Sequence, residues 1–167
     1  MGQDPEHEAR RGQPAAEVAN LGLVRPPVVY LASIGLGVLV HLFWPVKVLP
    51  ASINVPIGVL LVLAGVSLFV SSVRTFRNAG TPVPGNLPTT TIVRTGPYGF
   101  SRNPIYVAFT LFQVGLAAWV SSLGLLVTLL PALAVMMLVV IPREERYLEA
   151  RFPSEYLTYK REVRRWL

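Results

Sequence analysis

The longest uncharged stretch of the sequence covers residues 103–142, 40 residues without Asp, Glu, Lys or Arg. A single α-helix of that length would measure about 60 Å at about 1.5 Å per residue, which is twice the roughly 30 Å hydrocarbon core of a bilayer. The stretch must therefore fold back, and Ser121-Ser122-Leu123-Gly124 is the turn-like sequence near its centre. We expect a tight hairpin of two membrane-spanning helices, residues 105–120 and 123–141.

Two further apolar runs precede this hairpin, residues 28–46 and residues 48–73, the second densest over 57–73. Hydrophobic residues make up 52% of the chain and charged residues 14%, and all nine acidic residues lie before residue 18 or after residue 143. A soluble domain of this size needs charge spread over its whole surface. The sequence therefore predicts an all-α integral membrane protein with four transmembrane helices.

Basic residues are distributed unequally between the connections. The N-terminal tail, the 74–104 connection and the C-terminal tail together hold 14 Lys and Arg, whereas the two connections on the other side hold only Lys47. The positive-inside rule then places both termini and the 74–104 connection in the cytoplasm. The net charge of +6 fits an anionic membrane face, and we expect membrane lipid and no nucleic acid as a partner.

These patterns divide the chain into three parts. Residues 1–25 are polar and of mixed charge, which predicts a disordered cytoplasmic tail. Residues 26–141 form the four-helix transmembrane region, and residues 142–167 form a cytoplasmic or interfacial tail. Because the outer connections are short, functional groups are expected at the cytoplasmic face.

Several classes of site are excluded by absent residues or motifs. The sequence has no cysteine, which excludes disulfides, thiolate metal sites and cysteine nucleophiles. It also has no P-loop, no dinucleotide fingerprint, no nucleophile elbow and no zinc-protease motif. His41 stands alone in the first span, and we predict no metal site.

The connection before the hairpin ends in a polar segment rich in possible ligand contacts. Arg94, Tyr98, Arg102, Asn103 and Tyr106 converge on one helix N-terminus, an arrangement that suits an anionic or carboxylate-bearing ligand. The plainer interpretation is an ordinary helix entry, with Ser101 or Asn103 as the N-cap and an arginine that reaches lipid phosphate.

Glu144 and Glu145 are the first acidic residues after 126 positions without any, and they lie at the end of the fourth predicted span. Ionisable groups at membrane depth are candidates for function, so these carboxylates could meet the hydroxyls or the positive charge of a ligand. Alternatively, they form a solvated helix end in which Arg143 and Arg146 neutralise them.

The end of the chain has a helical repeat of apolar and aromatic residues. Tyr156, Tyr159, Val163 and Trp166 recur at spacings of 3, 4 and 3, with basic residues between them and Ser154 as a possible cap. This pattern predicts a basic amphipathic helix lying on anionic lipid, or one that closes over a pocket beside the hairpin.

Three motifs in a fixed order resemble a known family. They are Gly96-Pro97-Tyr98, Arg102-Asn103-Pro104-Ile105-Tyr106 and Glu144-Glu145-x-x-Leu148. Over residues 74–167 the sequence resembles the isoprenylcysteine carboxyl methyltransferase family and, more loosely, the related phospholipid methyltransferases. The resemblance implies an integral membrane enzyme that binds S-adenosylmethionine at the cytoplasmic face without a Rossmann domain, while a lipophilic acceptor enters from the bilayer.

The resemblance also implies site residues. The predicted cofactor-binding residues are Tyr98, Arg102, Asn103, Pro104, Tyr106, Glu144 and Glu145. Asn103 stands where the family typically has His, and an amide can hydrogen-bond a cofactor but cannot take up a proton. The predicted catalytic residues are Arg102, Glu145 and Arg165. The two arginines could hold an acceptor carboxylate bidentately, and Glu144 or Glu145 could bind the ribose hydroxyls or ammonium of the cofactor.

The expected reaction is methyl transfer to a lipophilic or prenylated carboxylate, such as an isoprenylcysteine-like compound. A carboxylate is ionised at neutral pH and needs no general base, and the cytoplasmic edge offers no histidine. Two alternatives remain: N-methylation of a phospholipid or small amine, and a non-enzymatic membrane protein that recruits anionic lipid or a partner.

Overall fold

A computed structural model describes residues 25–82 and 89–167, so the predicted disordered tail lies outside the described residues except for Arg25. The described part contains helices and no strand. Its elements are α2 (Pro26–Phe43), α3 (Asn54–Asn78), the 3-10 helix η1 (Gly96–Gly99), α4 (Pro104–Trp119), α5 (Leu123–Val135), the π segment η2 (Met136–Val140), α6 (Ile141–Arg151) and α7 (Pro153–Glu162).

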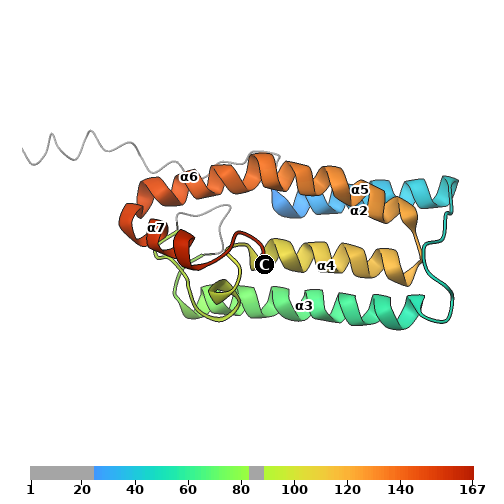
Figure 1. The fold of residues 1–167 in the computed structure, drawn as a ribbon, viewed down its shortest axis with the longest axis horizontal. Coiled ribbons are helices and arrows are strands. Elements are labelled where there is room, and N and C mark those ends of the chain that lie inside the picture. The colour runs from blue at the N-terminus through green and yellow to red at the C-terminus, as the bar shows by residue number, and fades with distance from the viewer. Residues whose placement is uncertain (1–24, 83–88) are drawn as a thin grey trace, which may run out of the picture.

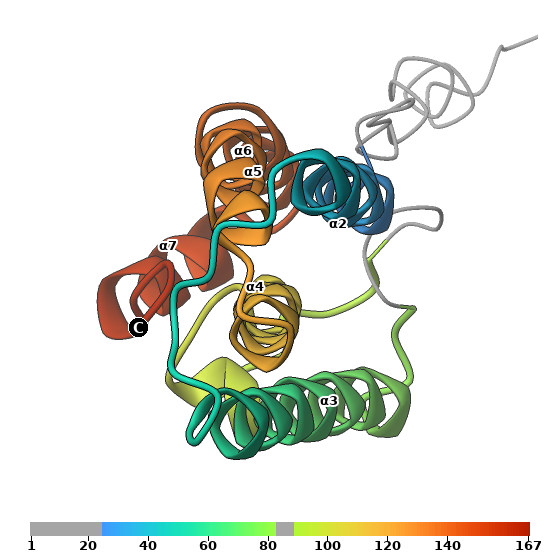
Figure 2. The same cartoon turned by 90° about the vertical axis from the view of Figure 1, so that its right-hand side faces the viewer.

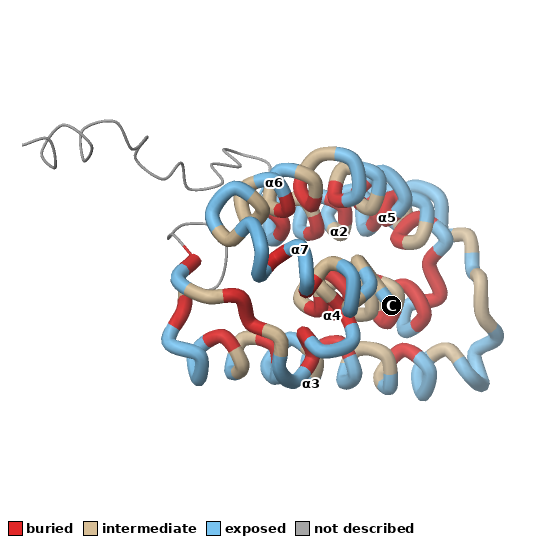
Figure 3. Tube along the Cα trace, turned by 60° about the vertical axis from the view of Figure 1, so that its left-hand side comes forward, coloured by how far each residue is buried: buried red, intermediate tan, exposed pale blue. Residues whose placement is uncertain are grey.

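Three of the described helices are long and apolar enough to cross a membrane: α2, α3 and the continuous helix Leu123–Arg151. The fourth apolar helix, α4, has 16 residues, about 24 Å of helix. The long helices carry many exposed residues (Figure 3), among them large apolar ones such as Leu60, which is 68% exposed, as expected where the solvent is lipid. The chain is therefore a multi-pass integral membrane protein, and the span of α4 remains a prediction.

Helix α4 lies at the centre of the bundle, with α3 on one side and α2 and α5 on the other (Figures 1 and 2). Glycines let these helices approach closely. A Cβ on Gly58 of α3 would lie 2.5 Å from the backbone of Trp119, and one on Gly115 would lie 2.7 Å from the backbone nitrogen of Val62. Small residues at helix contacts are typical of membrane bundles, in which van der Waals packing replaces the hydrophobic effect.

The turn of the predicted hairpin lies at Ser121 and Ser122. Ser121 has a φ of +53°, which is uncommon for a residue with a side chain. Its hydroxyl oxygen accepts hydrogen bonds from the backbone N–H groups of Val48 and Leu49 at 3.0 and 2.9 Å. Ser122 caps α5 by accepting from the N–H of Leu125 at 3.3 Å. These bonds stabilise the strained turn against the loop between α2 and α3.

The fourth predicted span does not end at residue 141. Helices α5 and α6 follow one path through the π segment Met136–Val140 and continue to Arg151 (Figure 1). Pro142, in the first turn of α6, lacks an N–H and would clash with the carbonyl four residues earlier in a regular helix. A π turn accommodates such an interruption without ending the helix. Glu144 and Glu145 therefore stand on a continuous helix.

The C-terminal helix α7 differs from the predicted amphipathic helix in its start, its end and the surroundings of its tyrosines. Helix α7 begins after Phe152, so Ser154 is not its cap, and it ends at Glu162, where Val163 takes up extended backbone angles. Tyr156 and Tyr159 are 2% and 4% exposed and pack against Ile92 and each other. The tyrosine face of α7 is thus covered by protein, as in the alternative in which this helix closes over a pocket.

Candidate functional site

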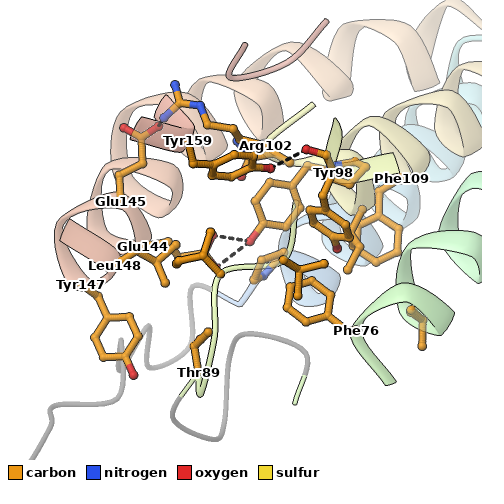
Figure 4. A pocket seen from close by; sticks show the side chains of 18 of the residues that line it. Phe76, Thr89, Tyr98, Arg102, Phe109, Glu144, Glu145, Tyr147, Leu148 and Tyr159 are labelled. Atoms are coloured by element: carbon orange, nitrogen blue, oxygen red, sulfur yellow. Dashed lines mark hydrogen bonds and ion pairs between the residues drawn. The ribbon is translucent and has the colours of Figure 1, made fainter. Parts of the chain in front are cut away.

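A cavity of about 590 Å³ lies at the end of the bundle where the start of α4 meets α6 and α7. Ligand pockets in proteins generally have volumes of a few hundred to a thousand Å³. All seven residues predicted to bind a cofactor line this cavity: Tyr98, Arg102, Asn103, Pro104, Tyr106, Glu144 and Glu145 (Figure 4). Arg165, predicted to be catalytic, is not among the lining residues. The roles of all eight remain predictions.

Glu145 lies between two arginines. One carboxylate oxygen of Glu145 is 3.0 Å from Nη1 of Arg102, and Arg165 binds both oxygens through Nε at 3.0 Å and Nη2 at 2.6 Å. The side chains of Arg102 and Glu145 are only 8% and 9% exposed, while that of Arg165 is 39% exposed. These hydrogen bonds raise the pKa of Arg165 above its ordinary value. Glu145 thus neutralises buried Arg102, and its hydrogen-bonding capacity is largely used by the protein.

Glu144 lines the same cavity and points into it, as Figure 4 shows. The hydroxyl of Tyr106 donates to its two carboxylate oxygens at 2.6 and 2.7 Å. Among the described residues, no Lys or Arg lies within ion-pair distance of Glu144. A carboxylate held by one phenol and without a cation can accept hydrogen bonds from ligand hydroxyls or attract a positively charged group.

One wall of the cavity is made by three tyrosines, Tyr98 of η1 and Tyr156 and Tyr159 of α7. The ring of Tyr98 meets Phe76 edge to face with centroids 4.8 Å apart, and its carbonyl accepts a 2.7 Å hydrogen bond from the hydroxyl of Tyr159. Arg102 donates to the hydroxyl of Tyr156 at 3.4 Å. Burial raises the pKa of Tyr156 to about 12 and that of Tyr98 and Tyr159 well above the ordinary value. All three are therefore neutral phenols at pH 7.

Several polar atoms at the cavity have no hydrogen-bond partner in the described part of the chain. They are the hydroxyl oxygens of Tyr98 and Tyr147 and Nε of Arg102, all buried and all on residues that line the cavity. Buried polar groups are nearly always paired in folded proteins. Unpaired donors beside an unneutralised carboxylate fit a ligand that carries both an anionic and a cationic or hydroxyl group.

Asn103 stands at the N-cap position of α4, as predicted, but its side chain makes no capping bond. Its amide donates instead to the carbonyl oxygen of Arg165 at 2.8 Å, and its backbone N–H donates to the hydroxyl of Ser101 at 3.1 Å. The side chain therefore connects the start of α4 to the C-terminal segment.

Sequence reasoning missed part of the lining. Arg25, just before α2, and Phe76 of α3 line the cavity, and Ile92, Tyr147 and Tyr156 line it from three later segments. Arg25 directly precedes the first span, which was a usable signal for a cation at this membrane face. The contributions of Phe76 and Ile92 had no such signal, because apolar side chains look alike in sequence whether they face lipid, core or cavity.

No group of three or more His, Asp and Glu among residues 25–82 and 89–167 could hold a metal ion.

Comparisons with known proteins point to a membrane methyltransferase family. A family model described as phospholipid methyltransferase matches residues 53–155, more than half of the chain. This match covers α3, α4, α5 and α6, and it includes Arg102 and both cavity glutamates, Glu144 and Glu145. It is broader than the isoprenylcysteine carboxyl methyltransferase resemblance, which stays a prediction.

Three similar proteins match shorter parts of the chain. The cobalt-zinc-cadmium resistance protein CzcN of Cupriavidus metallidurans is 41% identical over 71 residues, 42% of this chain and 32% of that protein. The nickel-cobalt-cadmium resistance protein NccN of Alcaligenes xylosoxydans is 40% identical over 66 residues, 40% of this chain and 31% of that protein. An uncharacterized protein of Haemophilus influenzae is 43% identical over 63 residues, 38% of this chain and 89% of that protein.

The matches to CzcN and NccN therefore span about a third of the length of those resistance proteins. No solved structure matches the chain.

Proposed function

The chain belongs to the phospholipid methyltransferase family, and from that premise we propose that it transfers a methyl group from S-adenosylmethionine to a lipophilic acceptor at one membrane face. The observation that carries the proposal is the cavity itself. Two segments some forty residues apart, around Arg102 and around Glu144, both line it, and they are the segments for which the sequence predicts cofactor contacts.

The polar groups of the cavity fit S-adenosylmethionine. Glu144 could accept from the ribose hydroxyls or attract the ammonium group. Nε of Arg102 and the hydroxyl of Tyr98 have no partner in the described part of the chain and could donate to the carboxylate. When bound, the cofactor supplies an electrophilic methyl group on a sulfonium. The chain's own residues then have to bind, orient and exclude water rather than create a reactive group.

The apolar part of the cavity suits a lipophilic acceptor. Its lining includes Phe69 and Val73 of α3, Pro27 and Val28 of α2, and Phe109 of α4. Helices α2 and α3 lie on different sides of α4 (Figure 2), so an apolar chain could enter between them from the bilayer. Ordinary Phe, Val and Pro side chains would accept many apolar chains and do not define a prenyl group.

A carboxylate acceptor, such as an isoprenylcysteine-like acid, is the first candidate. Arg102 is the buried cation of the cavity, and Arg25 lines the cavity without an ion pair to any described residue. Either arginine could orient a carboxylate, which needs no base at neutral pH. Arg165 is a weaker candidate than its sequence pattern indicates, because Glu145 already occupies its guanidinium.

An amine acceptor, such as an aminophospholipid, is the second candidate, and Glu144 favours it. This carboxylate lies in the cavity, and its one side-chain partner among the described residues is the Tyr106 hydroxyl. It could attract an ammonium group and later take a proton from it, a task for which sequence reasoning found no residue. The same carboxylate would repel an anionic acceptor that came close to it.

The orientation in the membrane follows from charge. Exposed arginines gather at the cavity end of the bundle, among them Arg74, Arg77, Arg143 and Arg146, and the positive-inside rule places that end in the cytoplasm. With α4 as a fourth span, both termini and the cavity share this side. A non-enzymatic protein that recruits anionic lipid would use the same arginines but would not need Glu144.

Binding of S-adenosylhomocysteine to the detergent-purified chain, measured by calorimetry, tests the proposal. We expect saturable binding that weakens about tenfold or more in Glu144→Gln, because hydrogen bonds to charged groups are worth about 1.5–3 kcal/mol. Glu149→Gln is the matched control, since Glu149 pairs with Lys160 and does not line the cavity. If the folded wild-type protein binds no S-adenosylhomocysteine, the methyltransferase proposal is wrong and the lipid-recruiting alternative takes its place.

Methyl transfer from labelled S-adenosylmethionine then distinguishes the acceptors. N-acetyl-S-farnesylcysteine and phosphatidylethanolamine, each in mixed micelles, represent the acid and the amine. Label in the first product alone favours a carboxylate acceptor, and label in the second alone favours an amine.

A further inference from the structure

The last residues of the chain are fastened to the start of α4. After α7 ends at Glu162 the backbone turns to an extended form at Val163. The backbone N–H of Arg102 donates to the carbonyl of Arg164 at 2.9 Å, and the side-chain amide of Asn103 donates to the carbonyl of Arg165 at 2.8 Å. We call residues 163–167 the C-terminal clasp.

The clasp is also held by packing and by charge. Trp166 packs against the cluster of buried residues that contains Tyr106 and Ile141. Arg165 binds both oxygens of Glu145, the carboxylate that also meets Arg102 at 3.0 Å. A continuous chain of contacts therefore runs from Asn103 through the clasp to Glu145 and back to Arg102.

Arg102 is the residue on which this chain of contacts ends. Its side chain is 8% exposed, it lines the cavity, and its Nε has no partner among the described residues. The free N–H of a buried guanidinium can donate to a ligand only in the direction that the other contacts of the guanidinium allow. Nη1 points to Glu145 and Tyr156, so the position of Glu145 determines where Nε can point.

We propose that Asn103 is a positioning residue: its amide fastens the C-terminal clasp, so that Arg165 holds Glu145 and Glu145 holds Arg102 toward the ligand in the cavity. The proposal rests on the proposed function for the nature of the ligand. It assigns Asn103 a contact with the protein's own backbone in place of the cofactor contact that its sequence pattern predicts.

The chemistry required at position 103 is a side-chain N–H donor that can reach a carbonyl. Asn supplies one at every pH, and His, the residue typical of the family that the sequence resembles, carries a ring N–H that can serve in the same way. Asp has a similar shape but only accepts hydrogen bonds when ionised. The proposal therefore separates substitutions by donor capacity and not by size.

The state of the clasp can be measured without any ligand. The chain has three tryptophans, so Trp44→Phe with Trp119→Phe leaves Trp166 as the single reporter. In this background we expect Asn103→Asp to shift Trp166 emission to longer wavelength and to increase its quenching by acrylamide. Asn103→His should return both signals toward the parent. Asn78→Asp, at the exposed end of α3, is the matched control and should change neither.

The effect on the site is measured by S-adenosylhomocysteine calorimetry on the same variants with both tryptophans restored. We expect Asn103→Asp to lower affinity roughly fivefold or more, the scale of one lost hydrogen bond, and Asn103→His to recover most of it. Asn103→Ala removes the donor without adding charge and carries the same expectation, in case the Asp variant does not fold.

Two results would overturn the proposal: unchanged Trp166 signals in both Asp and Ala variants, or weakened binding that His does not recover. If the wild-type chain binds no S-adenosylhomocysteine, the proposed function fails while the Trp166 signals still decide whether Asn103 fastens the clasp.

Discussion

The two ends of the bundle are stabilised in different ways. At the turn end, residues 44–53 and 119–123, neutral hydrogen bonds join Ser121 to Val48 and Leu49, and Gly58 lies against the backbone of Trp119. At the cavity end, residues 89–104 and 141–167, ion pairs and buried phenols join Arg102, Glu145 and Tyr156. Tight apolar packing holds the helices in place at one end, and charge compensation leaves room for a ligand at the other.

This difference indicates a division of labour. A close-packed end tolerates no added atoms, while an end built from paired charges tolerates changes of volume but not the loss of a partner. Substitutions chosen at each end should therefore fail for different reasons, and they can be ordered by the size of the expected effect.

Glu145→Gln is expected to have the largest effect. It leaves the guanidiniums of Arg102 and Arg165 beside a neutral amide, and the loss of one partner of a buried ion pair costs about 3–5 kcal/mol. The exposure of Arg165 places the expected loss toward the lower part of that range. Denaturant unfolding in detergent measures it. An unfolding free energy within about 1 kcal/mol of the parent would show that the cavity end does not depend on charge compensation.

Gly58→Ala tests the turn end. Its Cβ would lie 2.5 Å from backbone and side-chain atoms of Trp119, so α3 and α4 must separate, at a cost of about 1–3 kcal/mol. Gly35→Ala is the control, because a Cβ there meets nothing within 4 Å. We expect lower thermal stability for Gly58→Ala with unchanged affinity for S-adenosylhomocysteine in the folded fraction. Equal stabilities of the two variants would contradict the close packing of this end.

Lys160→Gln should have the smallest effect. Lys160 pairs with Glu149 at 2.5 Å, but both side chains are about a third exposed, and such pairs contribute about 0.2–1 kcal/mol. The loss should disappear at high salt, whereas that of Glu145→Gln should persist because burial limits screening. Melting curves at low and high salt check this, and a salt-independent loss at Lys160 would mean that this pair also belongs to the buried network.

The helices could largely be predicted from the sequence. Residues 105–120 and 123–141 were expected as a hairpin, and the structure has helices at Pro104–Trp119 and from Leu123 onward, because a 40-residue uncharged run must reverse at its one polar turn. The end of the last long helix could not be predicted. Pro142 indicates a helix boundary at residue 141, but the π segment before it lets the helix continue to Arg151. The burial of Tyr156 and Tyr159 was likewise one of two interpretations that the helical spacing alone left open.

The candidate site could be predicted as a set of residues but not as an arrangement. Seven predicted residues line one cavity because both of their segments lie at the same end of the bundle, which the charge pattern indicates. Arg165 was predicted from its charge to bind an acceptor, yet it pairs with Glu145. Contacts between residues more than sixty positions apart, such as that of Asn103 with Arg165, leave no periodic pattern in the sequence.

The sequence by itself determined that this chain is a helical membrane protein whose charged residues gather at one end. Only the tertiary structure decided that Glu144 binds the phenol of Tyr106 while Glu145 pairs with Arg102 and Arg165. Neighbouring residues on a helix point about 100° apart, so two adjacent glutamates meet different partners, and sequence does not say which of them meets the arginines. The ion pairs of Glu145 with Arg102 and with Arg165 of the C-terminal clasp set that choice.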